Sequence, residues 1–118
     1  MVRLLRPGDE PELERFLAPL ADRSMFLLAN SRKAGLVDSG LPFQATYAAA
    51  FEGARIVAVA AHSWLGTVLL QAPVRLDEVV RVALAASGRR VKGLLGPYSQ
   101  VLAAANALGA SEVADVYG

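Results

Sequence analysis

Two apolar runs of strand length, separated by a short turn, define the centre of this chain. Residues 43–51 and 55–62 are rich in alanine, valine and aromatic side chains, and Glu52 and Gly53 lie between them. A glycine between two such runs is typical of a tight hairpin, because hairpin turns need the positive φ that glycine tolerates. The sequence therefore predicts an antiparallel pair of strands in the middle of the chain.

A third strand and a crossover are predicted after the hairpin. Residues 67–71 form another apolar run, which Pro73 closes because proline has no N–H to donate to a strand ladder. A helical stripe of apolar side chains covers residues 76–87, and residues 91–95 form an apolar run without polar alternation. Strand–helix–strand connections are almost always parallel and right-handed, so 67–71 and 91–95 are expected to be neighbours in one mixed sheet.

The N-terminal part of the chain predicts one strand and two helices. A short strand over residues 2–5 precedes a helix over residues 10–22, in which apolar side chains recur at helical spacing. Asp9 supplies a side-chain oxygen suited to cap this helix. Ser24 is expected to cap the second helix, and Gly35 is expected to end it.

The last predicted element is a helix that opens at Gly96 and Pro97 and ends at Gly109. Residues 110–118 are too short to assign. The chain is therefore expected to form a single α+β domain over residues 1–118. Its mixed, mostly antiparallel sheet is flanked by helices in the order β-α-α-β-β-β-α-β-α.

Composition narrows the classes of protein that this domain could belong to. The chain has 118 residues, 54% of them apolar, which fits one domain with a buried core. No apolar segment is long enough to cross a membrane and the N-terminus does not resemble a secretory signal, so a cytoplasmic location is expected. A formal net charge of +1 gives no general attraction to nucleic acid or to an anionic membrane, and neither is expected as a partner.

Three short runs, residues 52–60, 70–73 and 91–97, are similar to part of a known family. They resemble the N-terminal region of bacterial tandem GNAT acetyltransferases, in which a degenerate GNAT-like half precedes a half that binds acetyl-CoA. The resemblance implies a GNAT-like fold lacking the last strand pair, and a non-catalytic role in support of a catalytic GNAT half. An open strand edge is usually covered, so that half or a homodimer partner is expected to cover it.

Residues 71–77 depart from the GNAT pattern where the family binds the pyrophosphate of CoA. Active members use spaced glycines, whose N–H groups at a helix start bind the phosphates. This stretch contains no glycine, and Pro73 has no N–H to donate. Asp77 would repel a pyrophosphate, and Arg75 would offset only part of that repulsion. Normal CoA binding is therefore not expected at this position.

Two other functions stay open: a minimal active N-acetyltransferase, and a dimeric scaffold or regulatory module without acyl chemistry. For the enzyme, acetyl-CoA would be the cofactor, with Gln71, Arg75 and the helix start at Gly96 as its binding groups. The family resemblance implies Tyr98 as a general acid toward the CoA thiolate. A tyrosine at a helix start also commonly packs its ring and leaves its hydroxyl in water.

His62, Ser63 and Trp64 are the only place where a titratable base, a hydroxyl and a large aromatic side chain occur together. Neighbouring residues of a strand point to opposite faces, so His62 and Ser63 are not expected to form a base–nucleophile pair. A structural histidine at a hairpin end, beside a partly buried Trp64, is the preferred interpretation. With no cysteine and a single histidine, the chain is expected to hold no metal.

Overall fold

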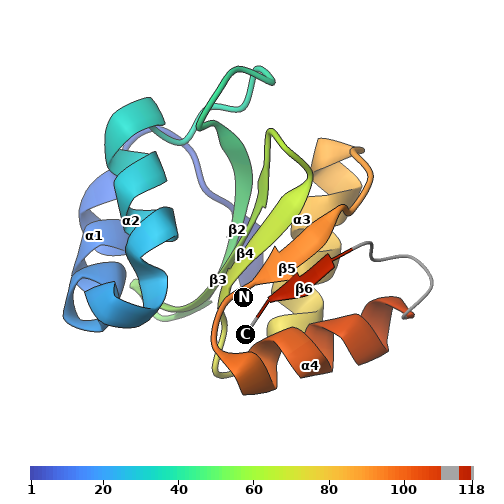
Figure 1. Ribbon diagram of the computed structural model, residues 1–118. Helices are drawn as coiled ribbons and strands as arrows, with labels where there is room; N and C mark the ends of the chain where they lie inside the picture. Colours follow the sequence, from blue (N-terminus) through green and yellow to red (C-terminus); the bar gives the residue numbers. More distant parts are fainter. Residues whose placement is uncertain (110–114, 118) are drawn as a thin grey trace.

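The chain folds around one mixed sheet with helices on both faces, as a computed structural model shows for residues 1–109 and 115–117 (Figure 1). The strands are β1 (Val2–Leu4), β2 (Ala45–Glu52), β3 (Arg55–Ser63), β4 (Thr67–Gln71), β5 (Gly93–Leu95) and β6 (Asp115–Tyr117). They lie side by side in sequence order. Strands β1 to β4 pair antiparallel, whereas β4, β5 and β6 pair parallel.

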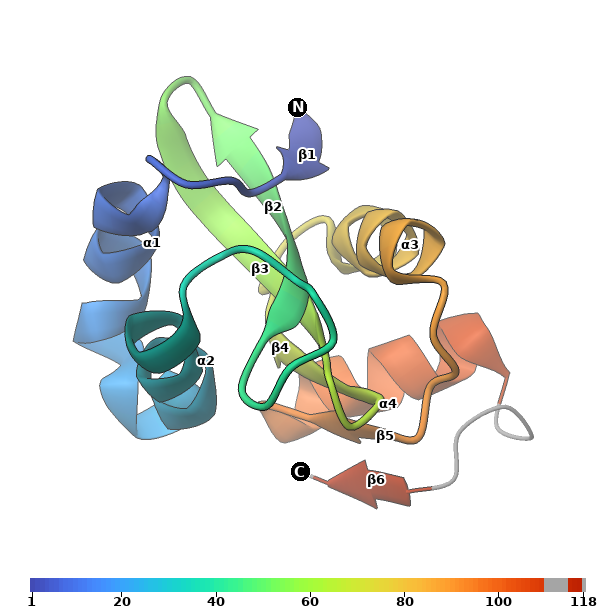
Figure 2. The ribbon, with the colours of Figure 1, turned by 90° about the horizontal axis from the view of Figure 1, so that it is seen from above.

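The helices form two layers, one on each face of the sheet, which Figure 2 shows from above. They are α1 (Glu10–Leu17), α2 (Ala21–Ala34), α3 (Leu76–Ser87) and α4 (Tyr98–Leu108). Helices α1 and α2 pack on one face, against β3 and β4. Helices α3 and α4 cover the other face, with α3 against β2 and β3 and α4 against β5.

Two hydrophobic cores result, and the central strands contribute to both. Ala49 and Val59 point into the core beneath α1 and α2, whereas Ala48 and Ala60 point into the core beneath α3. All four are fully buried. Because both faces of β2 and β3 are covered, these strands need no polar alternation, which is why the sequence shows apolar runs there.

Most of the predicted elements are confirmed. The central hairpin turns at Gly53, whose φ of +61° is the conformation expected there. Strand β4 covers residues 67–71 and α3 covers residues 76–87, as predicted. The parallel pairing of β4 with β5 is also confirmed, with Val68 opposite Leu94.

Three strands are shorter than the sequence predicts, and β1 ends at Leu4 instead of residue 5. The strand predicted over 43–51 begins instead at Ala45, because Phe43 has a φ of +68°, which no strand allows. The strand predicted over 91–95 is reduced to Gly93–Leu95. Just before β5, the Lys92 N–H donates to the carbonyl oxygen of Gly66. The backbone at Lys92 therefore bonds the turn between β3 and β4 instead of continuing the strand.

The fold differs from the predicted element order at its end. The sheet was expected to stop at the strand near residue 95, but β6 follows α4 and extends the sheet. It pairs parallel to β5, with Leu94 opposite Val116. The edge strand beside β5 is therefore β6, at the opposite edge from β1, and the predicted order β-α-α-β-β-β-α-β-α lacks this last strand.

The first helix ends earlier than predicted, at Leu17 instead of residue 22. A 3₁₀ turn, Ala18–Leu20, follows it, because Pro19 has no N–H to continue the helical ladder. Asp9 does not cap α1 through its side chain as predicted. Its carboxylate instead accepts two bonds from the Arg3 guanidinium, at 2.8 and 2.9 Å, because the charged pair is the stronger interaction.

Candidate functional site

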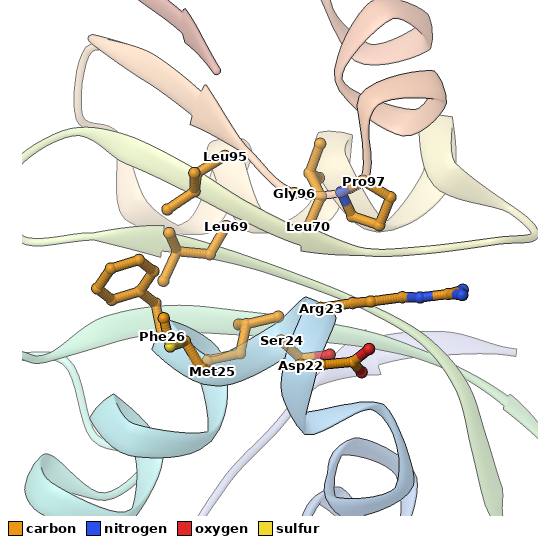
Figure 3. A pocket seen from close by; sticks show the side chains of 11 residues that line it. Asp22, Arg23, Ser24, Met25, Phe26, Leu69, Leu70, Leu95, Gly96 and Pro97 are labelled. Atoms are coloured by element: carbon orange, nitrogen blue, oxygen red, sulfur yellow. The ribbon is translucent and has the colours of Figure 1, made fainter. Parts of the chain in front are cut away.

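An open cavity of about 420 Å³ lies between α2 and the carboxyl ends of β4 and β5 (Figure 3). Its lining residues are Asp22, Arg23, Ser24, Met25, Phe26, Leu27, Leu69, Leu70, Leu95, Gly96 and Pro97. Ligands of sheets with parallel strands commonly bind outside the carboxyl ends of those strands. The position and size of this cavity make it the candidate functional site.

A kink in α2 places that helix at the side of the cavity. Ser24 has non-helical backbone angles, φ −132° and ψ 25°, so the helix changes direction there. Its Oγ lies 2.9 Å from the carbonyl oxygen of Leu20 and 3.0 Å from Oε1 of Gln71. The prediction that Ser24 caps the helix is wrong, because its hydroxyl bonds these oxygens and makes no cap.

Gln71 is thus a buried residue that holds the kink of α2 to the end of β4. It is 4% exposed and Ser24 is 3% exposed, so the buried amide oxygen of Gln71 depends on the Ser24 hydroxyl for its hydrogen bond. Gln71 does not itself line the cavity, but Ser24 does. Gln71, which was predicted to bind a cofactor, therefore contacts the lining residue Ser24 but is not itself exposed to the cavity.

Gly96 lies where the chain passes from β5 into α4, in close contact with β4. A Cβ at this position would be 2.7 Å from the carbonyl oxygen of Leu70 and 2.9 Å from Leu70 Cβ. Only a glycine fits this approach without a shift. Of the four site residues predicted from the sequence, Gly96 is the one that lines the cavity.

The start of α4 has backbone donors that the helix leaves free. The N–H groups of Gln100 and Val101 both donate to the carbonyl oxygen of Pro97, each at 3.0 Å. Within the described residues, the N–H groups of Tyr98 and Ser99 have no hydrogen-bond partner. They give the start of α4 a partial positive charge.

In the connection from β4 to α3, two groups that could donate to a ligand are already bonded within the protein. The Ala72 N–H donates to Oε1 of Gln100 at 2.7 Å. Arg75 has a left-handed backbone, φ +53°, and its guanidinium makes two bonds to Glu78, at 2.9 and 2.8 Å. The bond from Arg75 lowers the pKa of the Glu78 carboxyl, which is therefore charged at neutral pH.

Tyr98 is the first residue of α4, and its side chain is 65% exposed. It does not line the cavity, and neither does Arg75. The structure therefore does not bring together the four predicted residues, Gln71, Arg75, Gly96 and Tyr98, around one cavity.

His62 is fully buried and lies away from the cavity. Its Nδ1 is 2.6 Å from Oγ of Ser87, and its Nε2 is 3.1 Å from the carbonyl oxygens of Gly66 and Arg90. Burial lowers the pKa of the imidazole. A neutral ring with Nε2–H donating and Nδ1 accepting satisfies these contacts, so His62 is a structural residue joining β3 to two turns.

Sequence reasoning missed most of the cavity, including Arg23, Phe26 and Leu95. Apolar residues at the end of a strand or on a helix look the same in the sequence whether they are packed or line a cavity. The parallel pairing of β4 and β5, which was predicted, was the one signal that pointed to this edge of the sheet.

The fold and cavity define an α+β protein with a helix-flanked mixed sheet and a small apolar site. Comparisons of the chain with protein-family models, with curated proteins and with solved structures gave no match. Among the described residues, none of the helices is long and apolar enough to span a membrane. In the same part of the chain, no three His, Asp or Glu side chains are grouped as metal ligands would be.

Proposed function

We propose that this chain is a GNAT-like domain that supports a separate, acetyl-CoA-binding acetyltransferase half and does not bind CoA itself. The resemblance of residues 52–60, 70–73 and 91–97 supports the family. The parallel pairing of β4 with β5, next to an antiparallel meander, is compatible with that fold. The role of the domain follows from what the β4–α3 connection lacks.

The connection between β4 and α3 is the observation that carries the proposal. A pyrophosphate needs several N–H donors at a helix start. Here the Ala72 N–H is already bonded to Gln100, and Pro73 has none. The Arg75 guanidinium is held by Glu78, and Asp77 adds a second acidic side chain to the first turn of α3. The negative charges of Asp77 and Glu78, and the lack of a free N–H at residues 72 and 73, both oppose phosphate binding.

The test is a calorimetric titration of the purified chain with acetyl-CoA, with an active GNAT enzyme as the positive control for the assay. No heat of binding is expected. Glu78→Gln frees the Arg75 guanidinium, and this variant is also expected not to bind, since residues 72 and 73 still offer no free N–H and Asp77 keeps its charge. Micromolar binding by the unmodified chain would overturn the proposal in favour of the minimal active enzyme.

A second measurement separates the supporting domain from the dimeric scaffold. Sedimentation velocity at micromolar concentration gives the oligomeric state of the purified chain. A monomer is expected, because the proposed partner is a different domain. A stable homodimer that does not bind acetyl-CoA would favour the scaffold.

A further inference from the structure

We propose that the cavity between α2 and β4–β5 binds a small, uncharged and mainly hydrocarbon molecule, of the size of a single aromatic ring with a short substituent. The ligand lies against Phe26, Leu69 and Leu95. This site is separate from the β4–α3 connection, so the inference does not depend on the function proposed above.

The size of the cavity and its outer walls fit a small apolar ligand. Its volume of about 420 Å³ is within the range of small-molecule sites, roughly 300 to 1,000 Å³. The Phe26 side chain is 52% exposed and that of Met25 is 59% exposed, although both are large and apolar. A ligand against these walls removes apolar surface from water, which is the main driving force for binding.

The inner side of the cavity consists of core leucines. Leu27, Leu69 and Leu70 line it and are 2%, 5% and 1% exposed. Figure 3 shows Leu69, Leu95 and Phe26 together at one side of the cavity, one from each of β4, β5 and α2. The ligand therefore meets apolar side chains from three elements that are far apart in the sequence.

Ser24 is the one lining residue with a polar, uncharged side chain, and its hydroxyl is already engaged. Its Oγ lies 2.9 Å from the carbonyl oxygen of Leu20 and 3.0 Å from Oε1 of Gln71, so its single proton has two acceptors within the protein. A polar group of a ligand placed among the leucines would lose its hydrogen bonds to water and gain none from these side chains, which is costly. The part of the ligand that enters the cavity is therefore hydrocarbon.

The charges of the lining residues favour neither an anion nor a cation. Asp22 and Arg23 are the two charged residues of the lining, and their charges are opposite and equal. Both are exposed to water, and in Figure 3 Arg23 extends away from Phe26. Exposed charges contribute little to binding because water screens them. A charged ligand would lose hydration on entry without gaining a counter-charge, so the ligand is uncharged.

The test compares three probes that share one aromatic ring and differ in the charge next to it: toluene, benzoate and benzylammonium. Two-dimensional ¹H–¹⁵N NMR titrations of the chain give both the dissociation constant and the site. Toluene is expected to bind at least about tenfold more tightly than either ion, because a charge beside the ring must be desolvated when the ring enters. The shifts are expected at residues 22–27, 69–70 and 95–97.

Variants of exposed apolar residues test the wall without disturbing the core. Phe26→Ala is expected to weaken toluene about fivefold, because the ligand loses the apolar surface that covers it. Met25→Ala tests the second exposed wall residue in the same way. Leu65→Ala is the control: this leucine is 61% exposed, lies between β3 and β4, does not line the cavity and is expected to leave the affinity unchanged.

Variants of the two charged residues test the balance of charge. Neither Arg23→Gln nor Asp22→Asn is expected to change the affinity for toluene. The inference would be overturned by the absence of binding, by shifts centred elsewhere on the molecule, or by an ion that binds as tightly as toluene. It would also be overturned if neither Phe26→Ala nor Met25→Ala weakened toluene more than Leu65→Ala does.

Discussion

Ser24 Oγ and Gln71 Oε1 lie 3.0 Å apart and join the kink of α2 to the carboxyl end of β4. The residues are 47 positions apart in the chain, and both are almost completely buried. This bond connects the helix layer to the strand that forms the floor of the cavity. The shape of the cavity therefore depends on a polar contact inside an otherwise apolar region.

Removing this contact is predicted to destabilise the fold. Ser24→Ala is expected to lower the free energy of unfolding by about 1–3 kcal/mol, because the Gln71 amide loses a partner in a buried position. Adding Gln71→Leu is expected to cost less than the sum of the single variants, since the two residues share the interaction. Urea unfolding of the four proteins measures this coupling. Strict additivity would show that the contact contributes nothing.

His62 is predicted to make stability depend on pH. Burial places its pKa in the folded state below the ordinary value of 6.5, so the native state binds fewer protons than the unfolded chain between those two pKa values. The stabilisation is therefore complete above about pH 6.5 and is lost as the pH falls from there to the folded-state pKa. Urea unfolding at a series of pH values measures the loss.

The variant His62→Gln provides the comparison for this pH dependence. It is expected to be less stable at neutral pH, because the contacts to Ser87 and Gly66 are perturbed. The variant has no imidazole to protonate, so it lacks the loss of stability that protonation of His62 causes below about pH 6.5. The difference in the free energy of unfolding between the two proteins therefore shrinks as the pH falls. The nearby charges of Arg89 and Asp38 are present in both proteins. A difference that stays constant with pH would contradict the prediction.

Among the arginines that form ion pairs, Arg89 is predicted to contribute most to stability. Its guanidinium bonds Asp38 at 2.7 Å and the carbonyl oxygen of His62 at 2.8 Å, and it is only 23% exposed. Arg89→Met is expected to cost about 2–3 kcal/mol, since hydrogen bonds to charged groups are lost. The exposed neighbour variant Arg90→Met is expected to stay within about 0.5 kcal/mol. Equal effects in thermal unfolding would argue against the role of Arg89.

Gly96 is predicted not to tolerate a side chain. The Cβ of Gly96→Ala would lie 2.7 Å from the backbone oxygen of Leu70, so β4 and β5 must separate, at a cost of about 1–3 kcal/mol. Gly88→Ala is the comparison: its φ is +65° but no atom lies within 4 Å, so only the backbone strain of about 1 kcal/mol is expected. If Gly96→Ala unfolds at the same urea concentration as the native chain, the close approach is not constraining.

The local elements of this protein were determined by the sequence itself. Strand β4, helix α3 and the turn at Gly53 follow from patterns within about a dozen residues: apolar period, a closing proline and a glycine at positive φ. The parallel pairing of β4 and β5 also followed, because the handedness of a crossover is a local property of the chain.

Only the tertiary structure decided the site. Whether Ser24 caps a helix or bonds Gln71 depends on which buried polar group lies opposite it, 47 residues away. Whether Arg75 is free or held by Glu78, and whether Phe26 is packed or lines a cavity, likewise depends on the surroundings. Periodicity reports the direction of a side chain relative to its own helix or strand, whereas a site is formed by side chains that different elements bring together.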